Sequence, residues 1–202
     1  MSKLIEAKDK YLLEKAREGD AQAFGELVER YQAPVFNLCY RLLGNSGDAE
    51  DASQEAFIRA YRKLSTYDSR RKFVNWMLTI ASNYCVDKLR KRRLTLVSLD
   101  KLPLTDAARD KAAGPERALV LRDRQNEVQE LLIQLGPRDR AVIVLKYWSD
   151  MSYEEIAAAL SISESAVKSR LHRSKKELAV LWSKSNMQLE LANRRQDESS
   201  AI

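Results

Sequence analysis

Basic side chains are the residues of this sequence best placed to do chemistry, and they lie in two separate segments, of which the first also contains interleaved aromatic side chains. Eight basic and two acidic residues lie between Thr66 and Arg93, a net charge of +6. Six basic and two acidic residues lie between Ile162 and Ser185, a net charge of +4. The whole chain carries +6, so all other residues together carry −4. This segregation indicates two surfaces for a polyanionic partner such as nucleic acid.

The first basic segment combines Tyr67, Phe73 and Trp76 with the cations Arg70–Lys72 and Lys88–Arg93. Aromatic platforms beside a cationic track are typical of single-stranded nucleic acid binding, in which each stacked base is worth about 1–3 kcal/mol. The alternative is that Trp76 belongs to the hydrophobic core.

The second basic segment follows a predicted helix-turn-helix. Ser152 and Glu155 have capping-box spacing, which starts a short helix, and Ser163 can cap a second helix after a tight turn at Ser161. Ala157 is the small residue needed where two crossing helices approach closely. The second helix would present a polar stripe to a DNA major groove, the alternative being a solvated helix face. That stripe consists of Ser165, Lys168, Ser169, His172, Arg173 and Lys176.

An acidic stretch precedes the first basic segment. Asp48, Asp51, Gln54 and Glu55 share the side of a predicted helix opposite its alanines. Such an array suits docking against a basic or polar partner surface, and a solvated face is the alternative.

The elements that position these residues are all predicted to be helices. Apolar residues recur at helical spacing, and 45% hydrophobic residues in 202 are enough for real cores. We therefore expect an all-α fold of two helical domains joined by a flexible linker. The expected boundaries are 1–94 for the first domain, 95–115 for the linker, 116–184 for the second domain and 185–202 for a frayed polar tail.

Residues that cap or break helices indicate where the individual helices begin and end. Asp20 is expected to cap the first strongly amphipathic helix, in which Pro34 implies a kink or a split, and Gly44–Gly47 should end it. Asp48 is expected to cap the next helix. Gly136 should end a helix of the second domain, and Pro137 should lie in the first turn of the one after it.

Composition excludes several classes of protein. A single histidine and two cysteines, Cys39 and Cys85, cannot make a structural zinc site without several carboxylates, and no phosphate-binding glycine loop or nucleophile motif is present. We therefore predict no metal, no cofactor and no enzymatic activity. Without a signal peptide or a long apolar run, the chain is expected to be a cytoplasmic protein with reduced thiols.

The order of these parts resembles the extracytoplasmic-function (group IV, sigma-70 family) sigma factors of bacterial RNA polymerase. The resemblance covers about 20–181. The matching motifs are GDAQAF at 19–24, DAEDASQEAF at 48–57, FVNWM at 73–77, DKLRKR at 87–92, SYEEIA at 152–157 and AVKSRL at 166–171.

The resemblance implies a sigma region 2 domain at 1–94 and a sigma region 4 helix-turn-helix domain at 116–184. By resemblance, the polymerase-binding residues are Asp48, Asp51, Gln54, Glu55 and Phe57. The residues that would bind the melted minus-ten element, with one base flipped into a pocket, are Arg59, Lys63, Tyr67, Trp76, Asn83, Asp87, Lys88, Arg90 and Lys91. The residues that would bind the duplex minus-thirty-five element are Lys168, Ser169, Arg170, His172, Arg173, Lys175 and Lys176.

The partners implied are bacterial core RNA polymerase, promoter DNA in duplex and melted form, and an anti-sigma factor, without membrane insertion. The predicted function is promoter-specific transcription initiation. The alternative is a helix-turn-helix regulator that acts on duplex DNA without replacing a sigma factor.

Overall fold

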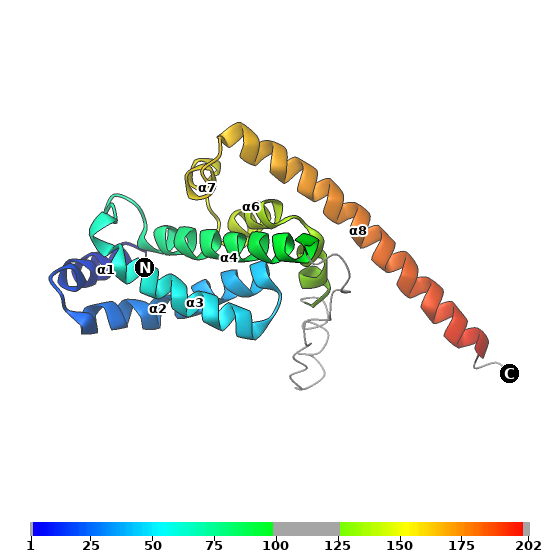
Figure 1. Ribbon diagram of the computed structural model, residues 1–202, viewed down its shortest axis with the longest axis horizontal. Helices are drawn as coiled ribbons and strands as arrows, with labels where there is room; N and C mark the ends of the chain where they lie inside the picture. The colour runs from blue at the N-terminus through cyan, green and yellow to red at the C-terminus, as the bar shows by residue number, and fades with distance from the viewer. Residues whose placement is uncertain (1, 99–125, 200–202) are drawn as a thin grey trace.

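Every regular element that the structure describes is helical, as the sequence predicts (Figure 1). The computed structural model describes residues 2–98 and 126–199. The elements are α1 (Ser2–Arg17), α2 (Ala21–Leu43), α3 (Ser46–Arg62), the short 3-10 helix η1 (Leu64–Thr66), α4 (Phe73–Ser98), α6 (Pro137–Tyr147), α7 (Tyr153–Leu160) and α8 (Glu164–Ser199). Residues 126–134 are also helical and precede α6. Within these ranges, no helix combines the length and the apolar character needed to cross a membrane.

Helix α2 begins and ends where the sequence predicts. The Asp20 carboxylate accepts hydrogen bonds from the backbone N–H groups of Gln22, at 2.9 Å, and Ala23, at 3.1 Å. The helix ends at Gly44, whose φ of 88° suits a residue without a side chain. Pro34 lies inside α2 and does not split it.

The cap of α3 differs from the prediction. Asn45, not Asp48, is the N-cap residue, and its side-chain oxygen accepts a hydrogen bond of 2.7 Å from the backbone N–H of Asp48. Asp48 instead lies in the first helical turn, where the helix dipole favours a negative charge. The two residues share this end of the helix, and sequence alone does not separate their roles.

The first domain contains one helix that the sequence analysis did not predict, α1. Its Leu12, Leu13 and Ala16 are buried against the rest of the domain. The predicted helix beginning near Phe73 is α4, and it includes the basic stretch Lys88–Arg93.

The helix-turn-helix of the second domain has the predicted local chemistry. Both hydrogen bonds of the Ser152–Glu155 capping box are present at the start of α7. Ser161 ends α7 with a φ of 52°, a left-handed conformation that favours glycine. The Ser163 hydroxyl then accepts a hydrogen bond from the backbone N–H of Ala166 in α8. Pro137 is in the first turn of α6, as predicted.

The structure bears differently on the two segments predicted to lie outside the domains, the linker and the tail. The predicted linker lies outside the described residues, except for 95–98, which continue α4. The predicted frayed tail is wrong for the residues described, because α8 continues to Ser199. No glycine or proline lies between Glu164 and Ser199, so nothing in the sequence breaks the helix.

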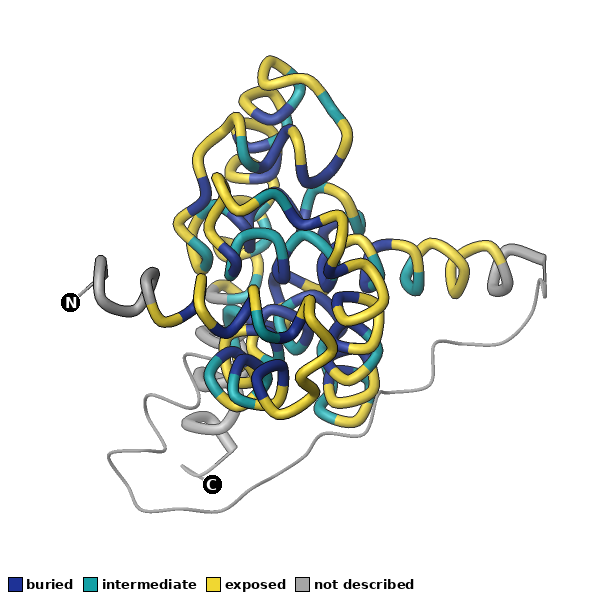
Figure 2. Tube along the Cα trace, turned by 90° about the vertical axis from the view of Figure 1, so that its left-hand side faces the viewer, coloured by how far each residue is buried: buried dark blue, intermediate teal, exposed yellow. Residues whose placement is uncertain are grey.

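The two domains pack into one body around α4. Figure 1 shows α2 and α3 on one side of α4, and α6 and α7 on the other, while the second half of α8 projects away. Figure 2 shows that the buried residues lie mainly where the helices pack against one another. Buried residues of both domains form a single hydrophobic cluster.

A buried arginine joins the two domains. The Arg140 guanidinium donates hydrogen bonds to the backbone oxygens of Leu42 in the first domain and of Ile133 and Leu135 in the second. Burial lowers the pKa of Arg140 to about 10. Because those carbonyls lie at helix ends, the guanidinium satisfies acceptors that the helices leave free.

Candidate nucleic-acid and protein interfaces

The acidic face of α3 is only partly available to a partner. Asp51 and Gln54 are exposed, and Gln54 lines a groove of about 380 Å³ between α2 and α3. Glu55 is half-buried and accepts a 2.7 Å hydrogen bond from Arg59. Phe57 does not lie on this face, because its ring is 8% exposed and belongs to the core. The periodicity of α3 places Phe57 beside its buried alanines.

Asp48 faces the basic end of α4. Its carboxylate is 2.7 Å from the Lys88 ammonium and 2.7 Å from the Arg92 guanidinium. Hydrogen bonds from Arg92, together with those from Lys88 and Asn45, hold the pKa of Asp48 well below its usual range. This carboxylate therefore links α3 to α4 within the protein. Two cations of the first basic segment are already paired with it.

The aromatic residues of the first basic segment form one cluster. Ring centroids are 5.1 Å apart for Tyr67 and Trp76, 5.8 Å for Phe73 and Trp76, and 5.6 Å for Tyr67 and Phe73. Tyr67 is 6% exposed, and its hydroxyl donates to the backbone oxygen of Arg71. The Tyr67 ring is therefore a floor of the cluster and does not face solvent. Trp76 is half-buried and keeps part of its ring at the surface.

The polar face of α4 contacts the helix-turn-helix domain. The Asn83 side-chain N–H donates a 3.0 Å hydrogen bond to the backbone oxygen of Ala159, and that of Asn75 donates a 2.5 Å hydrogen bond to Glu155. Both acceptors belong to α7. The same Glu155 closes the capping box through its other carboxylate oxygen. One predicted minus-ten residue, Asn83, is thus engaged by the second domain.

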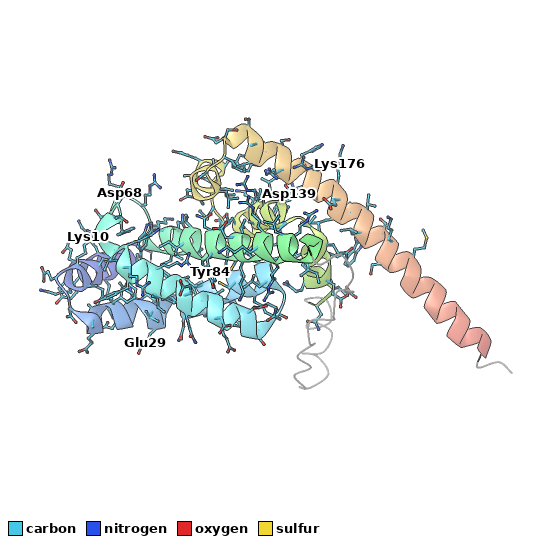
Figure 3. All side chains as sticks on the ribbon, in the orientation of Figure 1. Lys10, Glu29, Asp68, Tyr84, Asp139 and Lys176 are labelled. Carbon is cyan, nitrogen blue, oxygen red and sulfur yellow. The ribbon has the colours of Figure 1, made fainter. Side chains whose placement is uncertain are left out.

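The remaining predicted minus-ten residues are spread over α3 and α4. The Arg59 guanidinium lies over the Tyr84 ring, 4.6 Å from its centroid. Tyr84 lies on α4 (Figure 3). Asp87 and Arg90 are exposed and form a 3.9 Å ion pair. Lys63 and Lys91 are also exposed. These residues do not converge on a single point, and together with Trp76 they extend along the surface.

The polar stripe on α8 is largely free of the protein core. Its members Ser165, Lys168, Ser169, His172, Arg173 and Lys176 are all exposed, and so is the adjacent Lys175. Figure 3 shows Lys176 on α8 and Asp139 on α6 beneath it. Lys175 lies 5.4 Å from the Tyr147 ring centroid, and a hydrogen bond with the Tyr147 side chain raises the pKa of Lys175.

Arg170 differs from the other residues predicted to contact the minus-thirty-five element. It is half-buried, and its guanidinium is 2.8 Å from the Asp139 carboxylate. Arg173 reaches the same carboxylate at 3.3 Å, but its side chain is 61% exposed. Arg170 therefore fastens α8 to α6, whereas Arg173 is accessible to a further partner.

Three residues that sequence reasoning missed organise these surfaces: Asn75, Asp139 and Arg140. Each bonds to residues far away in the chain, at Glu155, Arg170 and Leu42 respectively. A spacing pattern carries no signal for such contacts. In the described ranges, no cluster of three or more His, Cys, Asp or Glu could hold a metal ion.

Two family models match separate parts of the chain. The model for sigma-70 region 2 matches residues 27–95, and a model for sigma-70 region 4 matches residues 125–178. Together they cover more than half of the chain and correspond to the two observed domains.

Known proteins are similar over most of the length. The ECF RNA polymerase sigma factor SigW of Bacillus subtilis is 36% identical, and the match covers 82% of this chain and 92% of SigW. The solved structure of CnrH in complex with the cytosolic domain of CnrY is 26% identical with a TM-score of 0.63, covering 88% of this chain and 98% of that one. The structure of the sigma factor RpoE in complex with the anti-sigma factor NepR, from Bartonella quintana, is 22% identical with a TM-score of 0.65, covering 81% and 98%, and shares the fold.

The region 2 match precedes the region 4 match in the chain, and SigW is similar over most of its length. The chain belongs to the ECF sigma factors of the sigma-70 family of bacterial RNA polymerase.

Proposed function

We propose that this sigma factor directs bacterial core RNA polymerase to promoters through two separate DNA contacts, one on each domain. The observation that carries the proposal is the presence of two distinct cationic surfaces, one on a region 2 domain and one on a region 4 domain of the same chain. A regulator acting on duplex DNA alone requires a helix-turn-helix but not a region 2 domain. The alternative reading is therefore not favoured.

The exposed stripe of α8 would contact the duplex minus-thirty-five element. Lys168, Arg173 and Lys176 project from one helix, as a helix that enters the major groove requires. Arginine and lysine reach guanine edges or phosphates, whereas Ser169 and His172 add further polar groups. Arg170 would act indirectly, by holding the angle between α8 and α6 through Asp139.

The aromatic cluster and the basic side chains near it would contact the melted minus-ten element. The half-buried Trp76 offers a stacking surface, and Tyr67 and Phe73 support it from below. Exposed cations at Arg70–Lys72 and along α4 would follow the phosphates of the unpaired strand. Asn83 can join them only after its hydrogen bond to Ala159 breaks, so binding requires α7 to separate from α4.

The acidic face of α3 would bind the polymerase. Asp51 and Gln54 are exposed beside the groove between α2 and α3, which a helix of the partner could occupy. Asp48 would support this surface from behind by holding α3 against α4.

An anti-sigma factor is the proposed regulator, and the structure of RpoE with the anti-sigma factor NepR supports it. We further propose that the protein has no catalytic role of its own and acts in the cytoplasm. Bond formation would belong to the polymerase that it recruits.

A reconstituted transcription assay tests this function. Core polymerase, the full chain and candidate promoter fragments should yield transcripts with a defined start that depends on the chain and on both promoter elements. An Arg173→Ala variant should lose initiation, while Lys184→Ala, which removes a cation from α8 outside the stripe, should not. Duplex binding without core enzyme, together with no effect on initiation, would favour the alternative.

A further inference from the structure

The loop between α3 and α4 is held from outside by the last residue of α1. The Arg17 Nε donates a 3.2 Å hydrogen bond to the Leu64 oxygen, and a terminal nitrogen of the same guanidinium donates to the Tyr67 oxygen. The guanidinium carbon also lies 5.7 Å from the Tyr67 ring centroid. One side chain therefore fixes both ends of a four-residue stretch that includes η1.

Helix α1 is itself firmly attached. The buried Asp9 carboxylate accepts hydrogen bonds from the Tyr31 hydroxyl and the Arg30 guanidinium of α2. Burial and this hydrogen bond raise the pKa of Tyr31. The Tyr31 ring contacts Phe73 edge-on, with centroids 5.4 Å apart, so α1 connects through α2 to the aromatic cluster.

The loop has a fixed inner side and a solvent-exposed outer side. Inside, the Tyr67 ring is buried and its hydroxyl binds the Arg71 oxygen. Outside, Ser65, Thr66 and 69–72 are exposed, and the latter range carries three cations. A pre-shaped backbone with exposed hydroxyl and cationic groups beside an aromatic surface is what capture of an unstacked base requires.

We propose that Arg17 is a positioning residue for promoter opening, which holds the loop from Leu64 to Tyr67 in the shape that receives the unstacked base of the minus-ten strand. The inference rests on the proposed function. It assigns a role to a residue that precedes the matched region 2 model, which begins at residue 27. Without Arg17, the loop must be ordered at the moment of base capture, and the conformational entropy lost in that ordering weakens binding.

The test measures binding of holoenzyme, formed from core polymerase and the full chain, to single-stranded oligonucleotides of the non-template minus-ten sequence. A set of oligonucleotides carries one abasic site at each position in turn. With the natural chain, one abasic site should weaken binding far more than the others. Arg17→Ala should weaken binding of the intact oligonucleotide about tenfold and abolish the penalty of that abasic site.

Two variants separate positioning from charge and from folding. Arg17→Lys keeps the charge but cannot span two carbonyls, so it should behave like Arg17→Ala, and it also serves if the alanine variant folds poorly. Lys15→Ala removes a cation from the same helix, one that pairs with Glu18 rather than with the loop, and this variant should bind all oligonucleotides as the natural chain does.

Three results would overturn the proposal. They are an equal loss for intact and abasic oligonucleotides in Arg17→Ala, a full rescue by Arg17→Lys, and the absence of any base-specific penalty in the natural chain. Each of them can occur while the natural chain still supports specific initiation. If the natural chain supported no specific initiation, that result would instead contradict the proposed function.

Discussion

The side chain of Asn75 in α4 donates a 2.5 Å hydrogen bond to Glu155 in α7, across the boundary between the two domains. Glu155 receives this bond while its other carboxylate oxygen closes the capping box of the helix-turn-helix. The start of the helix-turn-helix is thereby joined to the polar face of α4, and Asn83 of α4 adds a second bond to α7.

Removing this bond should open the interface. A hydrogen bond to a charged acceptor contributes about 1.5–3 kcal/mol, so Asn75→Ala should lower the ratio of closed to open chain at least tenfold. Energy transfer between dyes on Glu29→Cys and Lys176→Cys, both exposed, reports the distance between domains. The native Cys39 and Cys85 are buried and should remain unlabelled. Gln22→Ala, an exposed amide on α2, is the control, and equal transfer in both variants would contradict the expectation.

Arg140→Ala should destabilise the whole protein. It leaves the Leu42, Ile133 and Leu135 oxygens without their guanidinium donor, at a cost of about 3 kcal/mol in unfolding free energy. Urea denaturation should show the midpoint falling, while Arg138→Ala, an exposed neighbour, leaves it unchanged. Similar midpoints for the two variants would show that the buried contacts contribute little.

Asp48 should make stability depend on pH only in acid. Because its pKa is lower in the folded chain than the unfolded value of about 3.9, the stabilisation is complete above about pH 4 and is lost as pH falls through the folded pKa. Asp48→Asn should lose about 2 kcal/mol at pH 7, and its difference from the natural chain should shrink below pH 4. Asp51→Asn, an exposed acid on the same helix, is the control. A constant difference across this range would rule out the charge of Asp48 as the cause.

The two arginines that share Asp139 should behave differently. Arg173→Ala should reduce the slope of log binding constant against log salt for minus-thirty-five duplex by about 0.9, the value for one phosphate contact. Arg170→Ala should leave that slope unchanged and lower the unfolding free energy by about 1 kcal/mol, because its partly buried ion pair is structural. Titration at four salt concentrations measures the slopes, and identical slopes for Arg173→Ala and the natural chain would remove Arg173 from the interface.

Trp76 should matter more for opening than for initial binding. Trp76→Ala removes the partly exposed ring of the aromatic cluster, worth about 1–3 kcal/mol for a stacked base. Permanganate reactivity of unpaired thymines should fall by about tenfold or more, with duplex affinity nearly unchanged, and Trp76→Phe should restore part of the signal. Equal losses in both measurements, or a lowered unfolding midpoint, would support a purely structural role for Trp76.

Local chemistry is the part of this structure that the sequence predicts well. Asp20, Gly44, Pro137 and the Ser152–Glu155 pair act where they were expected, because capping depends on residues within one turn of each other. Asp48 was the exception. Asn45 is the N-cap residue of α3 in its place, and the Asp48 carboxylate forms ion pairs with two cations of α4.

Exposure separates the candidate residues that sequence spacing treats alike. The resemblance assigns Phe57 and Tyr67 to interfaces just as it does Trp76, yet the side chains of Phe57 and Tyr67 are buried. Arg170 and Arg173 are three residues apart on α8 and both reach Asp139, but the Arg170 side chain is 26% exposed and that of Arg173 is 61% exposed. Burial depends on which helices pack together, and that information is not contained in a single helical period.

The sequence by itself determined most of the helices, the helix-turn-helix, the segregation of charge into two basic segments, and the family. All of these depend on periodicity, capping and motif order, which act between near neighbours. Only the tertiary structure decided that α7 lies on α4, that Arg140 joins the domains and that Arg17 holds the loop beside Tyr67. These contacts join residues about 50 to 100 positions apart, and their energies come from burying polar groups that only the folded chain brings together.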